Sequence, residues 1–136
     1  LRPDGIRYIT ILLREDQPKI YGLDKLDYEK TTYITEGPFD SMLLSNAIAM
    51  AGADAVRPAG LALCVYVYDN EPRNRHITDR ISRHISAGES VVIWPSDLKE
   101  KDVNDMYLAG HDVQQIVQSC TYSGLTATLK LNDWKK

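Results

Sequence analysis

Acidic side chains recur in three short motifs, each placed where an apolar segment ends. Glu36 and Asp40 belong to the first motif, Asp69 and Glu71 to the second, and Asp102 to the third. Each motif follows a segment with the composition of a β-strand, and the carboxyl ends of parallel strands meet at one edge of a sheet. Carboxylates gathered at such an edge repel one another unless divalent cations lie between them. The spacing therefore predicts a magnesium site, and with it phosphate chemistry.

Each acid also has a purely structural interpretation, which stays open at this stage. Asp40 lies in the first turn of a predicted helix, where the helix dipole favours a negative charge. Asp69 or Glu71 could cap a helix that begins at Pro72, and the third motif could cap the helix that follows it. Glu36 has the weakest structural explanation, because a strand followed by Glu-Gly needs no cap.

Basic side chains lie close to the acids in the sequence. Lys101 directly precedes Asp102, and Arg73 follows Glu71 by two residues. Both cations are candidates to contact phosphate groups, and Lys101 could also balance the acids. Arg73 and Arg80 are seven residues apart, which predicts that they share one face of a helix.

The elements that must position these residues alternate between strand and helix. The pattern predicts strands at 31–35, 47–51, 61–68 and 90–94, and helices at 38–44, 72–87, 103–109 and 113–117. This alternation is typical of an α/β fold, in which a mostly parallel four-stranded sheet carries helices on both faces. Between the first strand and helix, Gly37 permits a backbone turn that a residue with a Cβ would resist, and Pro38 suits the first helical position.

The two ends of the chain lie outside this alternation. Segments 6–13 and 19–23 are rich in β-forming residues and predict an N-terminal β-hairpin. We expect residues 1–30 to be a β-rich lead-in, residues 31–120 the core of the α/β fold and residues 121–136 a C-terminal tail, all within a single domain.

Composition limits the classes of protein to which the chain can belong. Its 136 residues are 43% hydrophobic and 26% charged, as in an ordinary soluble globular domain. No apolar run approaches transmembrane length and no signal-peptide pattern is present, so we expect no membrane association. The net charge of -3 argues against general nucleic-acid binding. Nucleic acid would instead be contacted through metal-bridged phosphates and a local basic face.

Cysteine and histidine usage indicates neither a disulfide framework nor a zinc cluster. Cys64 and Cys120 are far apart in the sequence, which favours a reducing, cytoplasmic setting. Cys64 lies in an apolar run and is expected to be buried. The three histidines are scattered, and we expect them at the surface or in helix packing.

The three motifs, in this order, resemble the Toprim fold shared by primases, type IA and type II topoisomerases, and certain nucleases. Glu36-Gly37 matches the Glu-Gly pair of the family, and Asp69-Asn-Glu71 stands in for its Asp-x-Asp pair with a longer second acid. Glu36-Gly-Pro-Phe-Asp40 and Lys101-Asp-Val-Asn-Asp105 are similar to motifs of bacterial-type primases and phage primase-helicases. The Toprim resemblance covers residues 31–120, which it implies are the catalytic core. Longer strings, such as the one from Tyr33 to Met42, resemble the primases of T-even-type bacteriophages over nearly the whole chain.

The resemblance implies a primase, which makes RNA primers on a single-stranded DNA template from ribonucleoside triphosphates by two-metal nucleotidyl transfer. The cofactor would be Mg²⁺, in two ions that Mn²⁺ can replace. Its ligands would be Glu36, Asp69 and Glu71, with Asp40 and Asp102 as further partners, and Gly37, Arg73 and Lys101 would lie at the nucleotide phosphates. A replicative helicase is an implied partner, and the cytoplasm of a bacterial host is the implied location. Since two distant cysteines cannot form the N-terminal zinc-binding domain of family primases, we expect a C-terminal catalytic portion.

Two other functions remain open. A nuclease of the same fold would use the same metals to activate water and cleave phosphodiesters. Alternatively, the chain could be a module that docks a replicative helicase or single-stranded DNA, with an exposed tail ending in Trp134-Lys135-Lys136 as a candidate contact. A topoisomerase is less consistent with this length, because it needs a separately presented catalytic tyrosine and further domains.

Overall fold

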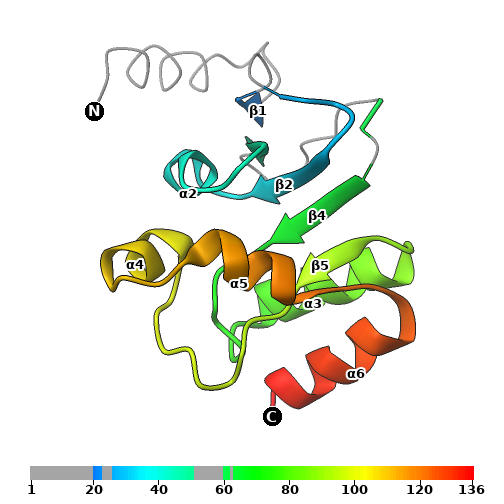
Figure 1. The fold of residues 1–136 in the computed structure, drawn as a ribbon. Coiled ribbons are helices and arrows are strands. Elements are labelled where there is room, and N and C mark those ends of the chain that lie inside the picture. Colours follow the sequence, from blue (N-terminus) through cyan, green and yellow to red (C-terminus); the bar gives the residue numbers. More distant parts are fainter. Residues whose placement is uncertain (1–19, 23–25, 51–59, 62) are drawn as a thin grey trace.

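A six-stranded mixed sheet forms the centre of the molecule (Figure 1). The structure is a computed structural model that describes residues 20–22, 26–50, 60–61 and 63–136. In spatial order the strands are β1 (Ile20–Tyr21), β3 (Ala47–Met50), β2 (Thr31–Thr35), β4 (Leu63–Val67), β5 (Ser90–Val92) and β6 (Thr121–Tyr122). The four inner strands are parallel to one another, and the two edge strands are antiparallel to their neighbours.

The four predicted strands are therefore confirmed as the parallel centre of the sheet, β2 with the predicted bounds and the other three with slightly shorter ones. The predicted four-stranded sheet omits β6, because a two-residue strand carries no detectable periodicity, and it leaves β1 to the N-terminal hairpin. One arm of the predicted N-terminal hairpin, residues 6–13, lies outside the described residues. The other arm contains β1, which pairs with β3.

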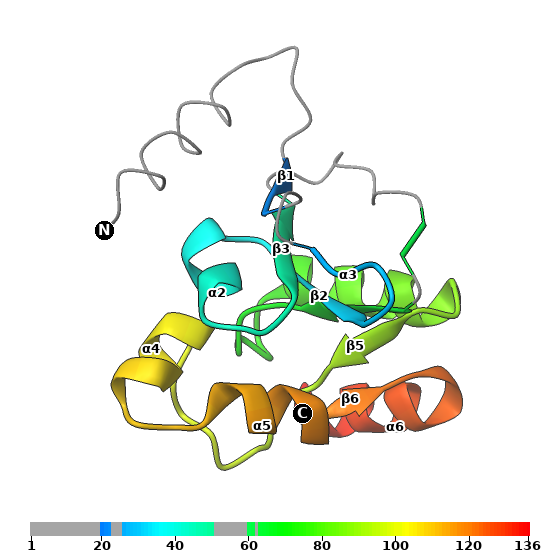
Figure 2. The same cartoon turned by 45° about the horizontal axis from the view of Figure 1, so that its top comes forward.

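Helices cover both faces of the sheet, as predicted (Figure 2). Alternate residues of β4 point to opposite faces, as the strand period of two requires. Val65 and Val67 pack with α4 (Val103–Leu108) and α5 (Val113–Ser119), whereas Cys64 and Tyr66 pack with α3 (Arg75–Ser86) and α6 (Gly124–Trp134). The remaining described helix, α2 (Pro38–Met42), follows β2. Cys64 is buried, as expected.

The helix after β4 begins later than predicted. Pro72 and Arg73 lie in a turn, and α3 starts at Arg75. The side chain of Asn74 caps this helix by accepting a hydrogen bond from the backbone N–H of His76 (3.0 Å). Arg73 therefore does not share a helical face with Arg80, because it precedes the helix.

The segment after residue 120 adds β6 and α6 to the fold. Ala127 and Leu131 of α6 are buried in the core, and Trp134 is partly buried against both core clusters. The prediction of an exposed tail is wrong for Trp134, whereas Lys135 and Lys136 are exposed. The pattern missed this helix because the exposed Leu125 and Leu129 weaken its amphipathic signal. The expected bounds of lead-in, core and tail stay predictions.

Of the helices in the described ranges, none is long and apolar enough to cross a bilayer.

Two leucines of α6 allow a matched test of its packing. Leu131 is 4% exposed and Leu129 is 62% exposed. We expect Leu131→Ala to lower the free energy of unfolding by about 2–4 kcal/mol, because it removes buried methyl groups and leaves a cavity. Leu129→Ala serves as the control and should change it by less than about 0.5 kcal/mol. Urea denaturation measures both, and equal effects would contradict the packing of α6 on the sheet.

Candidate metal centre

The first and second acidic motifs lie side by side at the carboxyl edge of the sheet. β2 and β4 are neighbouring parallel strands, with Thr35 paired to Val67. Glu36 follows β2 directly and Asp69 lies two residues beyond β4, so both acids project from the same edge. In Figure 1 the arrowheads of β2 and β4 point toward the side on which α2 and α4 lie. These two helices, which carry Asp40 and begin just after Asp102, contact each other.

The electrostatics of Asp69 reveal how closely the acids gather. Burial, as the largest cause, and the carboxylates of Asp40, Asp102, Glu36 and Glu71, in that order of effect, together raise the pKa of Asp69 to about 6. A carboxyl group surrounded by like charges holds its proton more tightly. The other four acids predicted from the sequence therefore all act on Asp69, which lies at the centre of their mutual repulsion.

Asp40 links the first motif to the third. Its Oδ1 accepts a hydrogen bond from the backbone N–H of Asn104 (3.2 Å). Burial raises the pKa of Asp40, as do the charges of Asp102, Asp105 and Glu36, whereas the hydrogen bond from Asn104 lowers it. Asp105, which the sequence placed in the third motif but not among the candidate ligands, thus also contributes charge to this edge.

The structural interpretation holds for Asp102 but not for the second motif. The side chain of Asp102 caps α4 by accepting a hydrogen bond from the backbone N–H of Asp105 (2.8 Å). Neither Asp69 nor Glu71 caps α3, because Asn74 fills that position. Asp102 therefore has a structural task as well as a place in the acidic group.

Glu71 has partners of its own at this edge. The chain bends at Asn70, where the backbone N–H of Glu71 donates a hydrogen bond to the carbonyl oxygen of Asp69 (2.8 Å). Glu71 forms an ion pair with Lys101 (3.6 Å) and accepts a hydrogen bond from Asn74 (3.3 Å). Lys101 therefore balances an acid, as one of its two predicted roles required.

Asn70 joins the second and third motifs. Its side-chain amide donates hydrogen bonds to the carbonyl oxygens of Leu98 (2.9 Å) and Glu100 (3.0 Å). Its backbone N–H donates to the carbonyl oxygen of Lys101. Its side-chain oxygen accepts a hydrogen bond from the indole N–H of Trp134 (3.2 Å). The loop that carries the third motif is thus fixed against the end of β4.

Tyr68, on the other side of Asp69, is held by two groups. Its carbonyl oxygen accepts a hydrogen bond from the indole N–H of buried Trp94 (2.8 Å). Its hydroxyl lies 2.6 Å from Nε2 of His84, whose Nδ1 lies 2.9 Å from Glu89. His84 also stacks on Tyr66, with ring centroids 3.7 Å apart. His84 is thus a packing residue, as expected, and helps to fix the strand end that carries Asp69.

Arg80 is a member of this edge that sequence reasoning did not assign. Its Nη1 lies 3.3 Å from Oε2 of Glu36, and both side chains are partly exposed. The two residues are 44 positions apart. No local pattern could have paired them, because the contact depends on α3 packing on the face of the sheet to which Ile34 of β2 points.

The structure gives two of the predicted phosphate contacts a different setting. Gly37 has φ -96° and ψ 138°, and a Cβ there would meet only Asp40, at 3.6 Å. The predicted conformational need for glycine is therefore wrong, because other residues adopt this extended backbone. Arg73 is exposed in the turn after Glu71. The phosphate-binding roles of both residues stay predictions.

The donor set at this edge fits a hard divalent cation, since it offers carboxylate oxygens alone. Within the described residues, however, no three His, Cys, Asp or Glu side chains are arranged so that they could hold a metal ion. The acids lie at one edge of the sheet and repel one another electrostatically. Their side chains must turn toward a common ion to coordinate it. Glu36 has the freedom to do so, because its side chain is 49% exposed.

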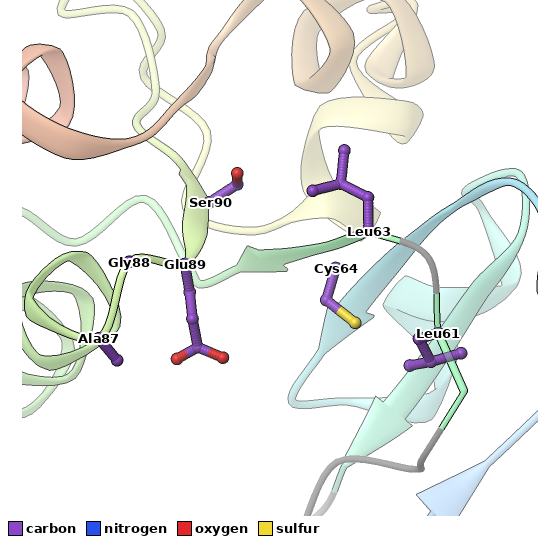
Figure 3. A pocket seen from close by; sticks show the side chains of 7 residues that line it. All are labelled: Leu61, Leu63, Cys64, Ala87, Gly88, Glu89 and Ser90. Carbon is purple, nitrogen blue, oxygen red and sulfur yellow. The ribbon is translucent and has the colours of Figure 1, made fainter.

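A hollow of about 380 Å³ lies elsewhere (Figure 3). Leu61, Leu63, Cys64 and the stretch Ala87–Ser90 line it. These residues lie at the amino ends of β4 and β5, which is the opposite edge of the sheet from the acids. The hollow is therefore separate from the acidic edge, which is the edge of the sheet that carries Glu36, Asp40, Asp69, Glu71 and Asp102.

Comparison with known proteins gives one clear relationship. No family model matches the chain. The chain is 33% identical, over 137 aligned residues and 96% of its length, to the DNA primase of Enterobacteria phage T4. It spans 40% of the length of that primase. The chain is thus related in sequence, along nearly all of its length, to a phage DNA primase.

The raised pKa of Asp69 predicts a pH-dependent penalty on stability in the absence of metal. A carboxyl whose folded pKa exceeds its unfolded value destabilises the fold above the folded pKa, and the penalty disappears as the pH falls below the unfolded value. We expect Asp69→Asn to raise the free energy of unfolding at pH 7.5 by about 1 kcal/mol, after allowance for solvent screening of a partly exposed group. The gain should vanish near pH 4.

Urea denaturation in the presence of a chelator, at pH 7.5 and at pH 4, measures this effect. Asp97→Asn is the matched control, because Asp97 is an exposed carboxyl outside the acidic group. A loss of stability in Asp69→Asn at pH 7.5 would show that the acids do not repel one another as described.

The contacts of Asn70 predict a large effect of its removal. Asn70→Ala deletes three side-chain hydrogen bonds and should lower the free energy of unfolding by roughly 2–3 kcal/mol. The exposed Asn132 on α6 provides the control, and Asn132→Ala should change it by less than about 0.5 kcal/mol. Equal unfolding temperatures for the two variants would contradict the role of Asn70 in fixing the loop.

Proposed function

We propose that the chain is the catalytic portion of a DNA primase with a Toprim-type site, which extends RNA primers on single-stranded DNA by adding ribonucleotides. The observation that carries the proposal is the convergence of acids around Asp69 in a chain related to a phage primase.

Glu36, Asp69 and Glu71 are the proposed ligands of two Mg²⁺ ions, with Asp40 and Asp102 bound directly or through water. Bound divalent cations stabilise both the attacking and the leaving oxygen of an in-line displacement, here a ribose 3′-hydroxyl and pyrophosphate. Before they bind, the acids repel one another, and the pKa of Asp69 is raised to about 6. Below about pH 6, Asp69 must therefore release a proton to become a ligand. Glu36 is a candidate to assist proton transfer from the 3′-hydroxyl.

Cationic side chains near the acids are the proposed phosphate contacts. Lys101 is 60% exposed and its ion pair with Glu71 is long, so a phosphate oxygen can replace Glu71 at small cost. Arg73 is exposed two residues beyond Glu71 and can meet a triphosphate or the template backbone. The backbone at Gly37 is the third proposed contact.

The proposed partners are a single-stranded DNA template, ribonucleoside triphosphates and a replicative helicase, in the cytoplasm of a bacterial host. The argument for helicase docking through the C-terminal residues is weakened by Trp134, which packs against the core and donates to Asn70. Lys135 and Lys136 remain the accessible part of that segment.

Template-directed synthesis tests the proposal. The chain is incubated with single-stranded DNA, labelled ribonucleotides and Mg²⁺ or Mn²⁺, and products are resolved by length. Glu36→Gln and Asp69→Asn should each lower the rate about 100-fold or more, since each removes charge needed around the transferred phosphoryl group. Asp97→Asn should retain the wild-type rate.

Two outcomes would redirect this assignment. Wild-type rates in both acid variants would remove Glu36 and Asp69 from the site. Metal-dependent shortening of the labelled DNA, without extension by ribonucleotides, would identify a nuclease that uses the same edge.

A further inference from the structure

Arg80 lies within the acidic edge and not on a remote surface. It is on α3, which packs on the face of the sheet to which Cys64 and Tyr66 point. Its Nη1 lies 3.3 Å from Oε2 of Glu36. The charges of both residues act on Tyr68, the residue before Asp69. Burial is the largest cause of the raised pKa of Tyr68; among the charges, Glu36 raises that pKa most and Arg80 lowers it. The guanidinium is therefore close to the end of β4 as well as to the end of β2.

Positive charge is scarce among the acids. Six carboxylates act at this edge, those of Glu36, Asp40, Asp69, Glu71, Asp102 and Asp105. Among the ion pairs of the described residues, two reach this group, Arg80 with Glu36 and Lys101 with Glu71. Both paired acids are proposed metal ligands. A divalent cation that binds Glu36 must therefore compete with Arg80 for the same carboxylate.

We propose that Arg80 occupies the place of a divalent cation on Glu36 and, when that cation binds, turns to the phosphate groups of the bound substrate. This inference rests on the proposed function. The ion pair is exposed enough to break readily, since the side chains of Arg80 and Glu36 are 33% and 49% exposed. The released guanidinium offers a planar set of donors that matches phosphate oxygens. The exchange keeps Glu36 neutralised and places a free positive charge beside the arriving phosphate.

The first measurement is metal binding without nucleotide. Free Mn²⁺ is titrated with the chain and followed by its electron paramagnetic resonance signal. Arg80→Gln should bind Mn²⁺ about threefold more tightly, because the competing ion pair is gone. Arg80→Lys keeps the competing charge and should bind as the wild type does. Arg83→Gln removes an exposed cation from the same helix and controls for the change in net charge.

The second measurement is phosphate binding at saturating Mn²⁺, by calorimetry. A ribonucleoside triphosphate and a single-stranded DNA oligonucleotide are tested separately, because either can supply the phosphate that Arg80 contacts. Arg80→Gln should weaken binding of one of them about tenfold, which identifies the source, and Arg80→Lys should weaken it less. Arg83→Gln should leave both affinities unchanged.

Opposite effects of one substitution on the two ligands are the signature of this role, and a purely structural arginine would not produce them. Unchanged or weaker Mn²⁺ binding by Arg80→Gln would overturn the competition, and unchanged binding of both phosphate ligands would overturn the contact. Wild-type protein that binds no Mn²⁺ would instead overturn the proposed metal site itself. Thermal unfolding of each variant confirms that it is folded. If Arg80→Gln does not fold, phosphate binding is tested with Arg80→Lys instead.

Discussion

The acidic edge depends on one side chain that carries no charge. Asn70 lies between Asp69 and Glu71 and ties the loop of the third motif to the end of β4 through the carbonyl oxygens of Leu98 and Glu100. Without the Asn70 side chain, the loop before Asp102 would lose two of its hydrogen bonds to the end of β4, and less would oppose the repulsion between Asp102 and Asp69. The amide is suited to this task because it both donates and accepts without adding to the negative charge.

A second constraint is the balance between repulsion and burial at Asp69. The fold holds the carboxyl group of Asp69 beside four others, and its pKa is raised to about 6. At neutral pH this arrangement destabilises the folded state. Anchors on both sides make the arrangement possible, with Trp94 bonded to the carbonyl of Tyr68 and Trp134 bonded to Asn70. Strain of this kind is typical of functional sites, where the surrounding structure fixes groups that would otherwise separate.

The sequence predicted the features that depend on periodicity and failed on those that depend on particular contacts. The parallel strands β2 to β5 and both layers of helices follow from apolar patterns, and the convergence of Glu36 and Asp69 follows from the parallel topology. The start of α3 was misplaced because Pro72 is compatible with both a turn and a first helical position, and Asn74 decided between them. The ion pair of Arg80 with Glu36 could not be predicted, because it joins residues far apart in the chain.

The segment after residue 120 illustrates the same limit. A two-residue strand and a helix with exposed leucines gave no usable pattern, yet α6 supplies Leu131 to the core and Trp134 to Asn70. The bond from Trp134 has an optical consequence. The two tryptophans of the chain donate their indole hydrogens to the residues on either side of Asp69, and indole fluorescence responds to such hydrogen bonds. Intrinsic emission therefore reports on this edge directly, with no label attached to the protein.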